Sequence, residues 1–118
     1  MNKISIIGAG MTGATATHWL AERELADLVL VDIVEGMPQG KALDLLQAMP
    51  IIAKDVNVVG SNDYAATKGS DIIIITAGLP RKPGMSRDDL LKTNAEIVGK
   101  AATEPLKDSP AAIYLLLI

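Results

Sequence analysis

The stretch "KISIIGAGMTGAT", residues 3–15, places an apolar run directly before a glycine-rich loop. The run "KISIIG" is nearly continuous in apolar residues, which is typical of a strand that is buried on both faces of a sheet. Residues 11–24 then carry Gly13, Ala14, Thr17, Leu20 and Ala21 on one face at helical spacing, small enough for tight packing on a sheet. The stretch therefore predicts a strand, a tight turn and a helix that packs closely on the strand.

Four further apolar runs follow, and polar or helical segments separate them: "LVLVD" (28–32), "VNVVG" (56–60), "DIIIITAG" (71–78) and "AIYLLLI" (112–118). Helices are expected over 38–48, with Leu43, Leu46 and Gln47 along one side, and over 87–104, where Pro105 ends the helix. The link from 60 to 71 is expected to hold one short helical turn. Strands that alternate with helices predict a parallel sheet covered on both faces.

The composition limits the class of protein. The chain has 118 residues, 49% of them apolar, a net charge of -3 and no cysteine. This predicts one folded domain, and the mild acidity argues against nucleic-acid or membrane-surface partners. The lack of cysteine excludes a disulfide framework and is typical of a cytoplasmic protein. No membrane helix or signal-peptide pattern is expected.

The loop "GAGMTG", residues 8–13, has the spacing of a dinucleotide-binding turn. Gly8 permits the turn, Gly10 lets the backbone approach a diphosphate, and Gly13 lets the helix press onto the sheet. Free amides at the helix start then hold the anion. Asp32, 19 residues beyond Gly13, is placed to accept hydrogen bonds from an adenosine ribose and to repel a 2′-phosphate. We predict an α/β fold with a Rossmann-type doubly wound parallel sheet of about five strands, and we predict NAD as cofactor. The alternative is a structural glycine turn with Asp32 capping a loop.

The segment "RKPGMSR", residues 81–87, concentrates positive charge after the fourth strand. Arg81 and Arg87 lie six positions apart, and Lys82 and a Pro-Gly turn lie between them. A guanidinium can bind a carboxylate through two hydrogen bonds, so the pair could hold an acidic substrate. A solvated basic loop is the alternative.

The remaining polar and aromatic candidates are expected to be less informative. His18, the single histidine, is expected to be packed or partly exposed on the first helix. Trp19 is expected to be exposed, which fits a subunit contact and chance exposure equally. Asp44 and the polar residues 62–64 are expected to be solvated. The sequence has no cluster with metal-ligand spacing.

Longer segments resemble one family. "IIGAGMTG", "VDIVEGMPQGKALDL", "SNDYAAT", "SDIIIITAGLPRKPGMSRDDLLKTNAEIV" and "SPAAI" are together similar to the amino-terminal part of malate dehydrogenases of the lactate-dehydrogenase-like type. The resemblance covers essentially the whole chain, and "GLPRKPGMSR" is its most specific part. It implies an NAD site formed by Gly8, Ala9, Gly10, Met11, Thr12, Gly13, Asp32, Ala77, Gly78, Asn94, Leu117 and Ile118.

The resemblance also implies a substrate. Arg81 would hold the distal carboxylate of malate or oxaloacetate, and Arg87 would polarise the reacting carbonyl. In the family this segment is a mobile loop that closes over the substrate, and Lys82 would supply a steering charge. Arg81 favours a dicarboxylate over lactate.

The same resemblance places the family's acid–histidine pair after the position of Ile118, so no catalytic residue is expected in residues 1–118. We therefore expect an NAD-binding Rossmann domain, a fragment of a two-domain dehydrogenase without the second domain, that is inactive alone. A homo-oligomer is expected, and the last strand is expected at a sheet edge that invites self-association. Two alternatives remain open, a stand-alone dinucleotide-binding module and a dehydrogenase of another 2-hydroxy acid.

Overall fold

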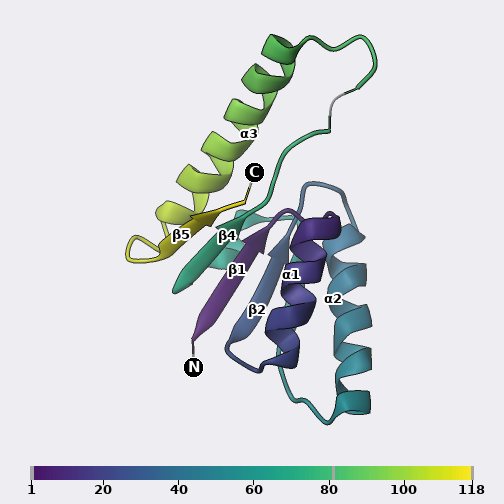
Figure 1. Cartoon of the computed structure of the whole chain (residues 1–118). Helices are drawn as coiled ribbons and strands as arrows, with labels where there is room; N and C mark the ends of the chain where they lie inside the picture. Colours follow the sequence, from purple (N-terminus) through teal and green to yellow (C-terminus); the bar gives the residue numbers. More distant parts are fainter. Residues whose placement is uncertain (1, 81, 118) are drawn as a thin grey trace.

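The computed structural model describes residues 2–80 and 82–117. These residues form a parallel sheet of five strands in the order β3-β2-β1-β4-β5 (Figure 1). The strands are β1 (Lys3–Ile7), β2 (Asp27–Val31), β3 (Val58–Ser61), β4 (Ile72–Ile75) and β5 (Ile113–Leu116). The predicted Rossmann-type sheet is confirmed.

Helices cover the two faces of this sheet. Helices α1 (Met11–Glu22) and α2 (Met37–Ala48) lie on one face, and α3 (Arg87–Leu106) lies on the other (Figure 1). Two short 3-10 helices, η1 (Met49–Ile52) and η2 (Tyr64–Thr67), complete the described elements, and η2 is the helical turn expected between the third and fourth strands. The chain passes from β1 outward to β3 and then returns to β4, so the strand order reverses beside β1. Ligands of such sheets bind at the carboxyl ends of the strands at this reversal.

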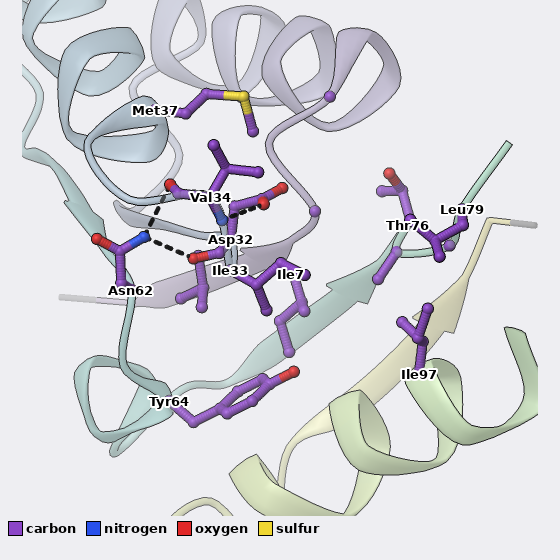
Figure 2. Close-up of a pocket in the computed structure, with 15 residues that line it drawn as sticks. Ile7, Asp32, Ile33, Val34, Met37, Asn62, Tyr64, Thr76, Leu79 and Ile97 are labelled. Carbon is purple, nitrogen blue, oxygen red and sulfur yellow. Dashed lines mark hydrogen bonds between the residues drawn. The ribbon is translucent and has the colours of Figure 1, made fainter. Parts of the chain in front are cut away.

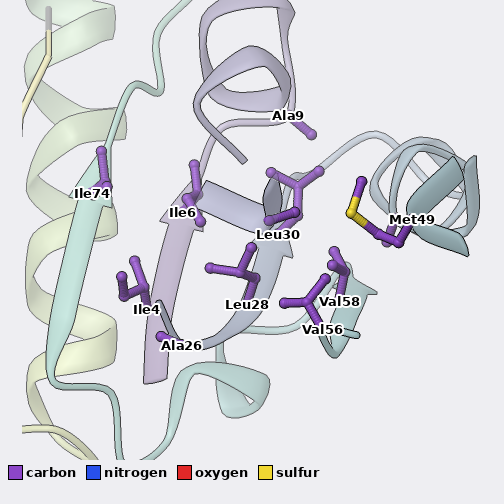
Figure 3. Close-up of a cluster of buried hydrophobic side chains, with 12 residues drawn as sticks. Ile4, Ile6, Ala9, Ala26, Leu28, Leu30, Met49, Val56, Val58 and Ile74 are labelled. Atoms are coloured by element: carbon purple, nitrogen blue, oxygen red, sulfur yellow. The ribbon is translucent and has the colours of Figure 1, made fainter. Parts of the chain in front are cut away.

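Two apolar clusters anchor the sheet. On the α1 and α2 face, Ile6, Leu28 and Leu30 are almost completely buried, and Figure 3 shows them beside Val58 and Met49. The cluster on the α3 face is smaller and includes Ile73, Ile75 and Ala101. Aliphatic side chains form both clusters almost alone, as expected for a chain without phenylalanine. Packing on both faces therefore holds the central strands β1, β2 and β4 in place. The loops that follow these strands begin at well-defined positions.

The first helix crosses the strand end at very short distance. A Cβ atom at Gly13 would lie 1.7 Å from the carbonyl oxygen of Gly8, a contact that no side chain tolerates. Gly13, Thr17 and Ala21 are buried, as the helical spacing predicts. Thr17 turns its hydroxyl inward and donates a hydrogen bond of 2.8 Å to the Gly13 carbonyl. Small residues therefore let the start of α1 lie directly on β1.

The face of α2 differs from the prediction. Pro38 and Ala42 are buried. Of the predicted side, Leu46 packs against the core, whereas Gln47 is exposed and Leu43 is 54% exposed. The cause lies in β3, where a Cβ atom at Gly60 would lie 2.2 Å from the Pro38 carbonyl oxygen. Because the two backbones touch there, the small residues of α2 are its most buried ones, and its larger side chains pack against the core only partly buried.

The carboxyl-terminal part of the described chain also corrects two expectations. Helix α3 continues through the buried Pro105 to Leu106, two residues beyond the predicted end at residue 104. Strand β5 is an edge strand as predicted, but it is not buried on both faces, because Ile113 is 62% exposed and Leu116 is 54% exposed. A continuous apolar run identifies a strand, but it does not show whether other elements of the fold cover one or both faces of that strand.

The contact between α1 and β1 gives a direct prediction for stability. Gly13→Ala should lower the free energy of unfolding by about 2 kcal/mol or more, because the new methyl group collides with backbone that cannot move aside. Gly99→Ala is the matched control, since a Cβ atom at this α3 position meets nothing within 4 Å. The control should be neutral or more stable by up to about 1 kcal/mol. Urea unfolding followed by circular dichroism measures both, and an equally stable Gly13→Ala variant would contradict the close packing.

Candidate dinucleotide-binding site

A cavity of about 240 Å³ lies at the carboxyl ends of β1, β2 and β4. Its lining combines the glycine loop, the segment after β2, the segment after β4 and one side chain from α3. Figure 2 shows residues from these segments, with Ile33 and Ile7 between Asp32 and Tyr64 in this view and Ile97 on α3. The cavity therefore occupies the reversal point of the strand order.

The glycine loop presents backbone donors to this cavity. Gly8 has a φ of +110°, which only glycine adopts without strain, and its N–H donates to the Val31 carbonyl over 2.8 Å. A Cβ atom at Gly10 would meet nothing within 4 Å, so the space in front of this residue is open. In the described part of the chain, nothing accepts a hydrogen bond from the amides of Gly10, Met11 or Thr12. These donors at the start of α1 form a site suited to an anion.

Asp32 follows β2 directly and connects two loops. Its Oδ2 accepts a hydrogen bond from the Ala9 amide over 2.7 Å, and its Oδ1 accepts one from the Val34 amide over 2.9 Å. A carboxylate has about four acceptor positions, so each oxygen keeps capacity for a ligand hydroxyl. Asp32 thus lines the cavity and also holds the glycine loop against the segment after β2.

Asn62, after β3, fixes the backbone around Asp32. Its Nδ2 donates to the carbonyls of Asp32 and Val34, over 2.8 and 2.9 Å, as the dashed lines in Figure 2 show. Gln39 on α2 donates to Asn62 Oδ1 over 2.7 Å, which fixes the amide orientation. Asn62 and Asp63 are exposed, as expected, but Asn62 also holds backbone in place, which the sequence did not predict. The side chain of Asp63 is also engaged, because it accepts a hydrogen bond from the Ala65 amide and caps η2.

Apolar side chains form the wall beside Asp32. Ile33, Val34 and Met37 line the cavity on one side, and Tyr64 and Ile97 line it from below (Figure 2). Ile33 is 80% exposed and Val34 is 52% exposed, so this part of the wall is open to solvent and to a ligand. The sequence analysis did not predict these residues. The apolar pair Ile33 and Val34 directly after Asp32 could have indicated an apolar wall beside the acid.

The phenol of Tyr64 is a neutral group in this wall. Burial raises the pKa of Tyr64 above its ordinary value of 10.0, and the negative charges of Glu104 and Asp32 raise it further. The hydroxyl therefore stays protonated throughout the physiological range. It offers a neutral hydrogen-bond donor beside an apolar surface.

The segment after β4 forms the other end of the cavity. Thr76, Ala77 and Gly78 line it, and the last two are among the residues predicted to contact NAD. Asn94 on α3 does not line it; its Oδ1 accepts a hydrogen bond from the Leu79 amide over 2.8 Å, and its Nδ2 donates to the Leu79 carbonyl over 3.4 Å. Asn94 thereby holds the segment that follows Gly78.

The predicted positions at the end of β5 are only partly described. The Leu117 amide donates to the Ile75 carbonyl over 2.8 Å, which continues the pairing with β4. Leu117 lies beside the strand end that leads to the cavity without lining it. Ile118 lies outside the described residues.

The basic segment leads from this site to α3. Arg81 lies outside the described residues. Arg87 is the first residue of α3, is exposed, and does not line the cavity. Ser86 and Asp89 form a capping box, in which the Asp89 amide donates to Ser86 Oγ over 3.1 Å. The cap fixes the residue at which α3 begins, and therefore the point from which the Arg87 side chain projects.

The other candidates lie away from the cavity. His18 is partly exposed, as expected, and its Nε2 lies 2.7 Å from Glu22 Oε1 on the same helix. Trp19 is 56% exposed, as expected, and Arg23 stacks over its ring. Asp44 is exposed on α2. Over residues 2–80 and 82–117, no group of three acidic, histidine or cysteine residues could hold a metal ion, and none of the helices has the length and apolar character needed to cross a membrane.

Comparisons with known proteins agree with this geometry. The family model for the lactate/malate dehydrogenase, NAD binding domain, matches residues 2–118. Malate dehydrogenase of Roseiflexus sp. (strain RS-1) is 59% identical over 115 residues, which are 98% of this chain and 37% of that protein.

Solved structures give the same result. The malate dehydrogenase of Cryptosporidium parvum matches with a TM-score of 0.88 and 48% identity, over 98% of this chain and 37% of that one. The Archaeoglobus fulgidus malate dehydrogenase in complex with NADH matches with a TM-score of 0.89 and 40% identity, over 97% and 39%. The chain thus spans little more than a third of the length of these relatives. It belongs to the family of NAD-binding domains of lactate and malate dehydrogenases.

Proposed function

We propose that this chain supplies the NAD site of an NAD-dependent malate dehydrogenase, an oxidoreductase that transfers hydride between malate and oxaloacetate. One observation carries the proposal. Gly10, whose amide is unpaired at the start of α1, and Asp32 line one cavity at the reversal of the strand order. An anion-binding end and a hydroxyl-accepting end in one cavity suit a molecule that carries a diphosphate next to a ribose.

The residues of the cavity fit the parts of NAD. The amides of Gly10, Met11 and Thr12 would hold the diphosphate, and the open space at Gly10 admits it. Asp32 would accept hydrogen bonds from the adenosine ribose, and the apolar wall of Ile33 beside it suits a flat base. The segment after β4 would carry the nicotinamide end. When bound, NAD supplies the hydride acceptor; these residues only hold and orient it.

The charge of Asp32 gives the preference between cofactors. A 2′-phosphate would approach the Asp32 carboxylate, which accepts hydrogen bonds from the Ala9 and Val34 amides, while Asn62 holds the Asp32 main-chain carbonyl. Because the side chain and the backbone of Asp32 are both held, the carboxylate cannot easily turn away from a second negative charge. NAD is therefore favoured over NADP.

The choice of malate rests on the basic segment. Arg81 would hold the distal carboxylate and Arg87 would polarise the reacting carbonyl, and both follow in sequence directly after the segment that lines the cavity. The family includes lactate dehydrogenases as well as malate dehydrogenases. A monocarboxylate such as lactate has no distal carboxylate and would leave the Arg81 guanidinium without a partner, and this favours malate.

Asp32→Asn tests the cofactor site. Asparagine keeps one acceptor oxygen where the carboxylate has two, so one bond to Ala9 or Val34 is lost together with the charge. NAD affinity should fall about tenfold or more, and the preference against NADP should shrink. Isothermal titration calorimetry with each cofactor measures this, and Asp108→Asn is the control for an exposed acid. Equal affinity of the unsubstituted chain for NAD and NADP would contradict the role of Asp32.

Arg81→Gln tests the substrate. With the chain saturated with NADH, malonate should bind more tightly than acetate. The substitution should lower the ratio of the two affinities about tenfold. Lys82→Gln makes the same charge change one residue away and should keep the preference. If the two variants lost it equally, a general electrostatic effect would explain the selectivity and the assignment of Arg81 would be wrong.

A further inference from the structure

The peptide groups on either side of Ala9 are held by oppositely charged side chains from different elements. The Ala9 amide donates to Asp32 after β2, and the Ala9 carbonyl accepts a hydrogen bond from Lys41 Nζ on α2 over 2.5 Å. Ala9 itself is completely buried. The turn between β1 and α1 is thus fixed from both sides at its middle residue.

The bond from Lys41 determines where the next amide points. The Ala9 carbonyl and the Gly10 amide belong to one planar trans peptide, so they point in opposite directions. Lys41 holds the carbonyl toward α2. The Gly10 N–H is thereby directed away from α2, on the side of the loop where Gly10 lines the cavity. A rotation of this peptide would present a carbonyl oxygen to the diphosphate in place of a donor.

The location of Lys41 separates this action from direct contact with a ligand. Lys41 does not line the cavity; it lies in the shallow groove between α1 and α2, beside Ala14 and His18. No carboxylate in the described part of the chain lies within 4.0 Å of its ammonium group. Its charge is therefore not neutralised by an ion pair there, and it stands directly behind the loop that would receive two negative charges.

We propose that Lys41 is a positioning residue for the cofactor diphosphate, which acts by fixing the peptide between Ala9 and Gly10 so that the Gly10 amide donates to the anion. The inference rests on the proposed NAD site. It adds a residue on α2 to a site otherwise built from loops that follow the strands. It also links the orientation of α2 to the affinity for phosphate groups.

Lys41→Met tests this role, because methionine has a similar length and cannot donate. The ligands are NAD, ADP-ribose and adenosine; adenosine has the base and ribose without a phosphate. Affinity for NAD and ADP-ribose should fall about tenfold, as for other hydrogen bonds to charged groups, and adenosine affinity measured by NMR should change less than about twofold. Lys41→Arg should recover most of the loss. Lys54→Met removes an exposed lysine elsewhere and should change nothing.

Each other outcome would overturn the inference. Equal losses for adenosine and NAD would mean that Lys41 merely supports the fold. Unchanged NAD affinity in Lys41→Met, or a loss with arginine as large as with methionine, would mean that the donor at this place is unimportant. If the unsubstituted chain bound adenosine and failed to bind NAD and ADP-ribose, the proposed function would fall as well, so the two failures are distinguishable.

Discussion

The site depends on the contact of two backbones, where α1 starts directly over the end of β1. Gly13 makes this possible, because any side chain there would collide with the Gly8 carbonyl. The contact places the unpaired amides of the helix start at the carboxyl end of the sheet, where their partial positive charge adds to that of the helix dipole. An anion can then be held by main-chain groups alone, without a basic side chain in the cavity.

Around this contact, side chains from several elements fix the loop rather than reach for a ligand. Asp32 holds the Ala9 amide, Lys41 holds the Ala9 carbonyl, and Asn62 holds the backbone that carries Asp32. Asn94 does the same for the segment after β4. Such prior fixing lowers the entropy lost on binding, because few groups must become ordered when the ligand arrives. The polar residues of the site thus act mostly on the backbone.

The sequence was sufficient for the sheet, the glycine turn and Asp32, since strand runs, glycine spacing and an acid at a strand end are local patterns. It was not sufficient for Asn62, Lys41 or Tyr64, whose partners lie 23 to 32 positions away or across the cavity. The predictions for the burial of Leu43 and of β5 were wrong for a related reason. Hydrophobicity indicates which residues gain from burial, whereas the elements that come to cover them are decided by close contacts such as that of Gly60 with Pro38.

The central claim is that a dinucleotide binds through its diphosphate to the amides that follow β1. The most direct measurement is a ¹⁵N–¹H correlation spectrum of the chain during titration with NAD. The amide signals of Gly10, Met11 and Thr12 should show the largest shifts, and ADP-ribose should reproduce them while adenosine should not. If these three signals stayed in place while NAD bound and shifted amides elsewhere on the sheet, the account of the site would be wrong.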